Sequence, residues 1–135
     1  MHEGATHSHA LRVYAEDTDF MGIVFHANYL NFFERARTEM MRDHGLSLTM
    51  MAEYDTQFAI RKVQLQFYAA AKLDDILNIT STLTKIKAFK FLFEQKIYNE
   101  AKKLLCSAII EVVCVNQYLK PRRLPIQFFG GDKRG

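Results

Sequence analysis

Apolar and polar residues alternate in several stretches of the chain. Leu11, Val13 and Ala15 alternate with Arg12, Tyr14 and Glu16, which is the two-residue period of a strand with one buried face. Strand-like composition returns in four longer stretches, at residues 58–68, 76–86, 89–99 and 104–116. The sequence therefore predicts one short strand near the start and four longer strands in the second half.

Two of the longer stretches carry further information. Between Ile60 and Val63 the apolar positions change parity, which predicts a bulge or bend near Arg61 and Lys62. The stretch 104–116 is apolar on both faces. We therefore expect it to be an interior strand or to lie at an interface.

Residues 29–44 have a different period, typical of an amphipathic helix. Asn28 is the predicted N-cap and Gly45 the predicted residue that ends the helix. The apolar positions at helical spacing are Tyr29, Phe32, Phe33, Ala36 and Met40. No other segment shows so strong a helical pattern.

One long helix and about five antiparallel strands predict an α+β fold in which the sheet wraps around the helix. A single helix covers only part of a sheet, so the remaining apolar surface predicts a homodimer or homotetramer. At 135 residues the chain has the length of one domain. We expect a flexible N-terminus over residues 1–10, a single domain over residues 11–128 and a tail over residues 129–135.

Composition narrows the class of protein. No apolar run approaches the roughly 20 residues that cross a bilayer, and residues 1–10 are polar and His-rich. Cys106 and Cys114 lie in one predicted strand, about 26 Å apart at the rise of a strand, so they cannot form a disulfide with each other. Both are expected to be reduced core residues of a cytoplasmic protein. The net charge of +3 is too small to indicate nucleic-acid binding but suits a polyanionic small ligand.

The segment between the first strand and the helix carries the candidate chemistry. Glu16, Asp17 and Asp19 fall within four positions, and a carboxylate in such a cluster can act as a base or a nucleophile. Gly22 follows in a loop, and the predicted helix then presents unpaired backbone N–H groups at its N-terminus. These parts suit acyl transfer, although a solvated acidic turn before an ordinary helix is an equally good interpretation.

The same segment resembles a known family. Residues 13–29 follow the pattern Val-Tyr-x-Glu-Asp-Thr-Asp-x-x-Gly-x-Val-x-His-Ala-Asn-Tyr, and residues 33–39 read Phe-Glu-Arg-Ala-Arg-Thr-Glu. Both resemble the 4-hydroxybenzoyl-CoA thioesterase family, and best its branch of acyl-CoA thioesterases associated with the Tol-Pal system. The similarity extends to residues 120–122 and covers almost the whole chain. Ala70 departs from it, since relatives often have proline there.

The resemblance implies a hotdog fold with active sites at a subunit interface, and hydrolysis of an acyl-CoA to a free acid and CoA without a cofactor. By position, Asp19 takes the catalytic role and the backbone N–H of His26 polarises the thioester carbonyl. Gly22 and Tyr29 would shape the pocket, and Asn28 would hold the helix entrance. The alternative function is a non-catalytic hotdog module that binds acyl-CoA or acyl carrier protein.

Two groups of residues are candidates for substrate contacts. Phe25, Tyr29, Phe32 and Phe58 could line the acyl pocket, although each could equally pack in the core. Basic side chains could contact the phosphates of CoA, with Lys87 and Lys90 as the preferred pair, although most could be ordinary solvated charges. The full basic set is Arg61, Lys62, Lys85, Lys87, Lys90, Arg122 and Arg123.

Three alternatives concern single motifs. Asp17 and Asp19 form an Asp-x-Asp pair that could bind Mg²⁺, but the alternating strand-helix pattern of such enzymes is missing. The His26 side chain could act as an acid or a ligand, although we expect only its backbone to take part. His2, His7 and His9 are more typical of a mobile polar terminus than of a metal site. No transmembrane segment is expected, and peripheral association with the cell envelope is a further hypothesis.

Overall fold

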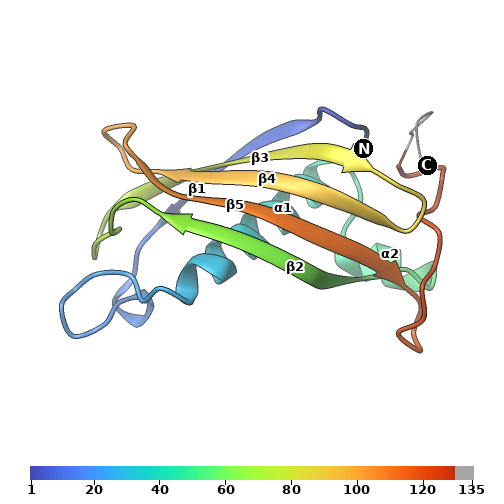
Figure 1. Cartoon of the computed structure of the whole chain (residues 1–135), viewed down its shortest axis with the longest axis horizontal. Helices are drawn as coiled ribbons and strands as arrows, with labels where there is room; N and C mark the ends of the chain where they lie inside the picture. Colours follow the sequence, from blue (N-terminus) through green and yellow to red (C-terminus); the bar gives the residue numbers. More distant parts are fainter. Residues whose placement is uncertain (130–135) are drawn as a thin grey trace.

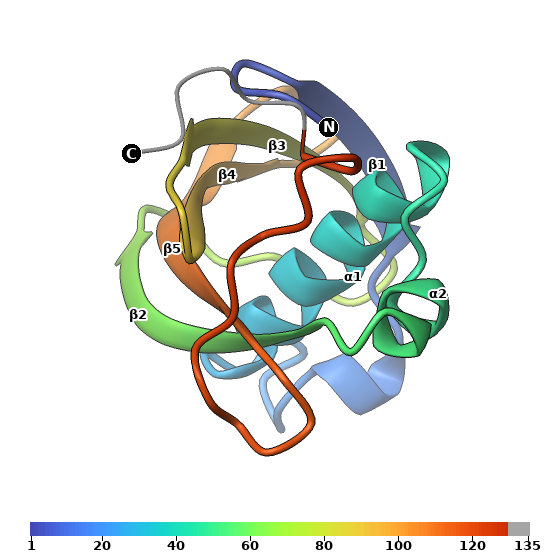
Figure 2. The ribbon, with the colours of Figure 1, turned by 90° about the vertical axis from the view of Figure 1, so that its right-hand side faces the viewer.

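A computed structural model describes residues 1–129 and has one antiparallel sheet of five strands curled around a long helix (Figure 1). Seen along the helix in Figure 2, the sheet forms an arc with the helix inside it. The predicted α+β hotdog arrangement is therefore confirmed. The strands are β1 (Thr6–Arg12), β2 (Gln57–Phe67), β3 (Ile76–Ile86), β4 (Lys90–Tyr98) and β5 (Leu104–Val115), in the sheet order β1-β3-β4-β5-β2.

The helix α1 (Asn28–Asp43) buries one face against the concave side of the sheet. Full burial of large apolar side chains contributes about 1.5–3 kcal/mol each, so this contact supplies much of the stabilisation of the fold. Phe32, Phe33 and Met40 of α1 are fully buried, as are the inward residues Leu77, Ile79, Phe91, Phe93 and Ile97 of the sheet. The core thus lies between the helix and strands β3, β4 and β5.

The two ends of α1 agree only in part with the sequence prediction. Ala27 is the N-cap and Asn28 is the first helical residue, so the predicted cap at Asn28 is wrong; its side chain has another partner, described below. Gly45 does end the helix, with φ at +74°. Its N–H donates to the carbonyl of Arg42 at 2.9 Å, and the next N–H, of Leu46, donates to Met41 at 2.8 Å. This is a Schellman motif, which glycine adopts without strain.

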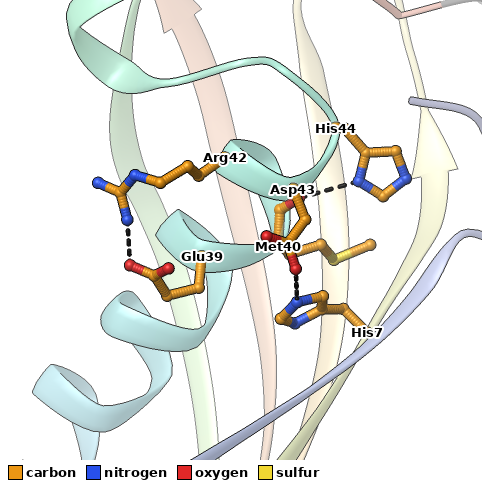
Figure 3. Close-up of polar contacts among 6 residues, drawn as sticks. All are labelled: His7, Glu39, Met40, Arg42, Asp43 and His44. Carbon is orange, nitrogen blue, oxygen red and sulfur yellow. Dashed lines mark hydrogen bonds and ion pairs between the residues drawn. The ribbon is translucent and has the colours of Figure 1, made fainter.

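The first strand begins earlier than predicted. Residues Thr6 to Ala10 pair with β3, so the expected flexible N-terminus over residues 1–10 is wrong for this segment. Backbone pairing at a sheet edge does not require apolar side chains, which is why the polar composition concealed the strand. His7 also donates from Nε2 to the Asp43 carboxylate at 2.7 Å, and so links β1 to the end of α1 (Figure 3).

A second helix, α2 (Leu48–Glu53), was not predicted. Its six residues are too few to show a clear period. The only local signal is Ser47, whose hydroxyl caps the helix by accepting the N–H of Met50 at 3.1 Å. The helix contributes Met51 to the core.

The predictions for the last strands are confirmed. The register of β2 against β5 shifts between Ile60 and Lys62, where a bulge was expected. Strand β5 lies between β4 and β2, inside the sheet, whereas β2 is an edge strand. Cys106 and Cys114 are both free and buried, and burial raises their pKa to about 12 and about 11.

The described chain ends at Phe129, which is fully buried and stacks on Phe91 with ring centroids 5.4 Å apart. Packing therefore extends one residue beyond the predicted boundary at 128. The remainder of the predicted tail, residues 130–135, lies outside the described residues.

Candidate active site

Asp17 is the buried member of the acidic cluster. It ends a short 3-10 helix (Ala15–Asp17) directly after β1, and only 5% of its surface is exposed. Its carboxylate accepts the N–H of Tyr14 at 2.9 Å and the side-chain amide of Asn28 at 2.8 Å. Both oxygens are therefore occupied, and Asp17 fastens the acidic turn to the first residue of α1.

Asp19 lies in a small hairpin and is exposed. Its N–H donates to Ile23 at 2.9 Å, and its carbonyl accepts the N–H of Gly22 at 3.1 Å. The carboxylate accepts the N–H of Met21 at 2.8 Å, which is the pattern of an Asx turn. Gly22 has φ at +75°, a conformation that other residues rarely adopt. The hairpin thus holds the Asp19 carboxylate at the surface.

A second set of contacts anchors this hairpin to the segment after β2. Val24 donates its N–H to Ala71 at 2.9 Å, and Leu73 donates to Gly22 at 3.0 Å. The N–H of Ala71 in turn donates to the hydroxyl of Tyr29, at 3.0 Å. Tyr29 is buried, and burial raises its pKa. It holds the loop and the helix together from inside, which differs from the predicted place in the wall of a pocket.

The N-terminus of α1 is open. Phe25 donates its N–H to Asp17 at 3.1 Å, and Asn28 donates to Phe25 at 2.8 Å. His26 and Ala27 lie between these two donors, and their N–H groups make no backbone hydrogen bond within residues 1–129. The His26 side chain is exposed and lies against the half-exposed Phe25 ring, with centroids 4.4 Å apart. Free donors at the positive end of a helix can stabilise an oxyanion.

The structure therefore brings together one part of the predicted site, at the end of the sheet where β2 ends and β3 begins. This part consists of Asp19, Gly22, Phe25, His26, Asn28 and Tyr29. The remaining predicted residues are Phe58, Arg61, Lys87 and Lys90.

Those remaining basic residues lie elsewhere in the same chain. Lys87 and Lys90 flank the turn between β3 and β4, which is at the opposite end of the sheet from the Asp19 hairpin (Figure 1). With Arg61 they line a pocket of about 530 Å³. Glu111 balances part of their charge, since it lies 3.5 Å from Arg61 and 3.2 Å from Lys90. Within one chain, these cations do not share a site with Asp19.

A separate cleft of about 350 Å³ runs between α1 and the sheet. Leu30 and Asn31, in the first turn of α1, line it together with Phe58. Phe58 is half-buried and its ring also contacts Phe91, with centroids 5.3 Å apart. Phe32 is fully buried in the core and does not line this cleft, so its predicted place in an acyl pocket is not supported.

Two polar residues beside this cleft were not predicted from the sequence. Arg37 of α1 lines it and donates to the side-chain oxygen of Gln95, at 2.9 Å. Gln95 is fully buried in β4. It interrupts the inward series Phe91, Phe93 and Ile97, and this interruption was a readable signal of a buried polar contact.

No group of three His, Cys, Asp or Glu side chains among residues 1–129 is arranged to hold a metal ion. In the same residues, no helix combines the length and apolar character needed to cross a membrane.

Comparison with known proteins gives the family. The model of the thioesterase-like superfamily matches residues 13–127. The acyl-CoA thioester hydrolase YbgC of Escherichia coli O6:H1 is 44% identical over 116 residues, covering 85% of this chain and 87% of that protein. The acyl-CoA thioesterase YbgC of Haemophilus influenzae is 38% identical over 120 residues, covering 87% and 88%.

Solved structures agree with this match. A probable thioesterase from Bartonella henselae superposes with a TM-score of 0.85 at 38% identity, covering 90% of this chain and 100% of that chain. A 1,4-dihydroxy-2-naphthoyl-CoA thioesterase from Synechocystis gives a TM-score of 0.83 at 27% identity, covering 90% of each.

The fold and the matches define the class of protein as a hotdog-fold thioester hydrolase. The chain belongs to the thioesterase-like superfamily. Its similarity to the YbgC proteins fits the predicted branch of thioesterases associated with the Tol-Pal system.

Proposed function

We propose that this protein hydrolyses acyl-CoA thioesters, with Asp19 as the catalytic carboxylate and the backbone N–H of His26 as the oxyanion donor. The observation that carries the proposal is one loop that presents an exposed carboxylate, at Asp19, and leads into free N–H groups at the start of α1. The names of the YbgC relatives, acyl-CoA thioester hydrolase and acyl-CoA thioesterase, support the choice of substrate.

Burial separates the three carboxylates of the cluster. Both carboxylate oxygens of Asp17 accept hydrogen bonds from internal donors. A reaction at this carboxylate would therefore break the contact that holds the loop on α1. Glu16 and Asp19 are exposed. Of these two, Asp19 belongs to the hairpin that leads directly to the helix N-terminus, and its orientation is fixed by the Met21 N–H. These contacts favour Asp19.

In the proposed reaction the thioester carbonyl oxygen accepts a hydrogen bond from the His26 N–H, which stabilises the negative charge that develops there. Asp19 takes a proton from a water molecule, and the oxygen of that water attacks the carbonyl carbon. The carbon–sulfur bond then breaks, and the CoA thiolate takes up the proton. In the variant route, Asp19 attacks the carbonyl carbon itself, the carbon–sulfur bond breaks, and water hydrolyses the resulting anhydride, which supplies the proton that the CoA thiolate takes up. Both routes use the same groups, and the products are a carboxylic acid and CoA.

A dimer through the free edge of β2 would complete this site. Strand β2 is eleven residues long and β5 pairs with only one of its sides. Ile60 and Phe67 on this strand, and Tyr68 just after it, are about half exposed, which is typical of a surface that a partner covers. A two-fold axis at the middle of β2 pairs it antiparallel with its copy. The Gln57 end of one chain would then lie beside the Phe67 end of the other.

This dimer brings together the residues that one chain keeps apart. The pocket with Lys87 and Lys90 is at the Gln57 end of the sheet, because Lys90 and Phe58 pair with the same part of β5. The partner's loop at the Phe67 end carries its Asp19. We propose that the Lys87 and Lys90 of one protomer contact the CoA phosphates of a substrate bound at the other protomer.

Replacing Lys87 and Lys90 with glutamine tests this contact. The KM for acyl-CoA should rise several-fold with kcat preserved, because the phosphates bind equally in the ground state and the transition state. Lys96→Gln is the matched control, because Lys96 is a partly exposed lysine on the same strand as Lys90 and likewise pairs with a glutamate, Glu94, at 3.5 Å. Unchanged kinetics in the Lys87 and Lys90 variant would contradict the contact.

We propose that the enzyme acts in the cytoplasm, where reduced buried cysteines such as Cys106 and Cys114 are stable. Acyl carrier protein could replace CoA as the carrier of the acyl group. Peripheral association with the cell envelope remains a hypothesis that follows from the Tol-Pal branch.

A thiol-release assay tests the enzymatic proposal. Purified protein is mixed with acyl-CoAs of increasing chain length and with acyl carrier protein loaded with the same acyl groups, and free thiol is recorded. Release above the uncatalysed rate, undiminished in excess EDTA, is expected. Binding of acyl-CoA without any thiol release would favour the alternative function, a hotdog binding module.

A further inference from the structure

Arg37 is a cation on the inner side of α1, in the wall of the cleft between the helix and the sheet. The other walls are mostly apolar, with Phe91 and Phe93 of β4 among them. Within residues 1–129 its guanidinium makes one hydrogen bond, at 2.9 Å, to the side-chain oxygen of Gln95. A guanidinium has five N–H donors, so most of its hydrogen-bonding capacity is left unused.

The partner of Arg37 is neutral. Gln95 is held in place by two further contacts, since its amide donates to the carbonyl of Phe33 at 3.0 Å and to the hydroxyl of Ser81 at 2.9 Å. None of the ion pairs within residues 1–129 includes Arg37. Burial lowers its pKa to about 10, the direction expected for a cation that has lost water without gaining an anion. A positive charge in an apolar cleft favours an anionic ligand.

We infer that this cleft receives the acyl group of the substrate, and that Arg37 binds a carboxylate at the far end of that acyl group. The substrate class is then a dicarboxylic acid joined to CoA through one of its two carboxyl groups. This inference rests on the proposed function for the position of the thioester, because it places the reacting carbonyl at the helix N-terminus.

The length of the cleft suits such a substrate. Leu30 and Asn31 bring one end of the cleft to the first turn of α1, close to the proposed oxyanion donor. Arg37 follows Ala27 by ten residues, about 15 Å along the helix axis. Long side chains of a helix lean towards its N-terminus, which shortens the distance to the guanidinium. An acyl chain of moderate length would span this distance.

Glu34 weakens the binding of an anionic ligand to Arg37. It lines the same cleft one turn before Arg37, but it is exposed and forms no ion pair within the described residues. Its charge raises the pKa of Arg37, so it partly compensates the guanidinium from a distance. A bound carboxylate would compete with Glu34, and removing the charge of Glu34 should strengthen binding of the anionic substrate.

The experiment compares kcat/KM for two matched pairs of substrates, adipoyl-CoA with hexanoyl-CoA and suberoyl-CoA with octanoyl-CoA. In at least one pair the wild type should prefer the dicarboxylic substrate by about tenfold or more, the usual strength of a hydrogen bond to a charged group. Arg37→Met should lower that ratio by about the same factor. Glu34→Gln should raise it. Arg35→Met, an exposed arginine on the same helix, should keep the wild-type ratio.

Arg37→Gln is a second variant for the case that Arg37→Met does not fold, because glutamine is polar yet carries no charge. It should also lose the preference. A wild type that hydrolyses the plain acyl-CoAs as well as the dicarboxylic ones, or a preference that persists in both Arg37 variants, would overturn the inference.

Failure of the proposed function would look different, since no acyl-CoA would be hydrolysed at all. The inference is then tested by calorimetric titration with the same four compounds. About tenfold tighter binding of a dicarboxylic member, lost in the Arg37 variants, would support the inference, and equal affinities within both pairs would overturn it.

Discussion

Asp17 and Asp19 are separated by one residue, yet the fold gives their carboxylates opposite surroundings. The carboxylate of Asp17 is buried and accepts hydrogen bonds from Tyr14 and Asn28. The carboxylate of Asp19 is exposed and accepts one, from Met21. The first residue stabilises the loop, and we propose that the second reacts. Substitutions at the two positions should therefore separate stability from activity.

Asp17→Asn should destabilise the protein. The Tyr14 N–H and the Asn28 amide bond to different oxygens of Asp17, and asparagine keeps only one of these oxygens, so one part-buried donor loses its partner, at a cost of about 1–3 kcal/mol. Urea unfolding followed by circular dichroism measures this change. Glu16→Gln, at an exposed position in the same turn, should change the free energy of unfolding by less than about 0.5 kcal/mol. Equal stability of the Asp17 variant would contradict the structural role given to this carboxylate.

His26→Ala tests whether the side chain or the backbone of this residue matters. The imidazole is exposed and lies against the Phe25 ring, whereas the N–H is part of the helix N-terminus. Because alanine keeps the N–H, kcat should fall by no more than about tenfold, well short of the effect of losing a general acid. A loss of several orders of magnitude in a variant with an unchanged circular dichroism spectrum would assign an acid-base role to the imidazole.

At the level of helices and strands, the segments with a clear period of apolar residues were predictable. The helix over residues 28–43 and the four long strands follow directly from apolar spacing. Most of strand β1 and all of helix α2 were not, because residues 6–10 of the strand are largely polar and the helix has only six residues.

The contiguous residues of the candidate site were predictable from the sequence, but the relative positions of distant segments were not. Sequence resemblance singled out Asp19 and the loop up to Tyr29, since these residues are contiguous. It could not show that Lys87 and Lys90 lie at the other end of the sheet, because that depends on strand order. Nor could it show that Arg37 faces a cleft, since its role depends on Gln95 across the core.

The two buried cysteines of β5 should make the protein less stable at alkaline pH. Burial raises the pKa of Cys106 from its ordinary value of 9.0 to about 12, and that of Cys114 from 9.0 to about 11. Below pH 9 both thiols are neutral whether the chain is folded or unfolded. As the pH rises above 9, the unfolded chain releases these protons before the folded protein does, so the free energy of unfolding falls.

Urea unfolding at about pH 8 and about pH 10 measures this effect. The wild type should lose stability between the two values, and Cys106→Ala/Cys114→Ala should lose less, although it is less stable at the lower pH. A thiol reagent should label the folded wild type far more slowly than the unfolded chain. Equal pH dependence of wild type and variant, with rapid labelling of the folded protein, would contradict the burial of the two thiols.

At the scale of the whole molecule, the sheet has one long uncovered edge, β2, and the proposed site residues lie at two ends that one chain does not bring together. In the proposed dimer, antiparallel pairing of β2 with its copy would cover the edge and unite the two ends. The same axis requires residues near the middle of the strand to lie close to their own copies.

Ile60→Lys/Gln64→Lys tests this arrangement, because an axis at Lys62, the middle of β2, places residue 60 of each chain opposite residue 64 of its copy. The wild type should be a dimer, or a tetramer of such dimers, in light scattering at micromolar concentration. The variant should dissociate at least about tenfold more readily, since like charges directly opposite each other across paired strands are destabilising. A monomeric wild type would contradict the dimer, as would a variant with unchanged mass at all concentrations.

We propose that the Asp19 carboxylate carries out catalysis in this thioesterase. The most direct measurement is kcat for thiol release by Asp19→Asn beside the wild type and Glu16→Gln, with folding of each checked by circular dichroism. We expect a loss of about 10²- to 10⁴-fold for Asp19→Asn and a nearly unchanged rate for Glu16→Gln. Equal rates for Asp19→Asn and the wild type would contradict it.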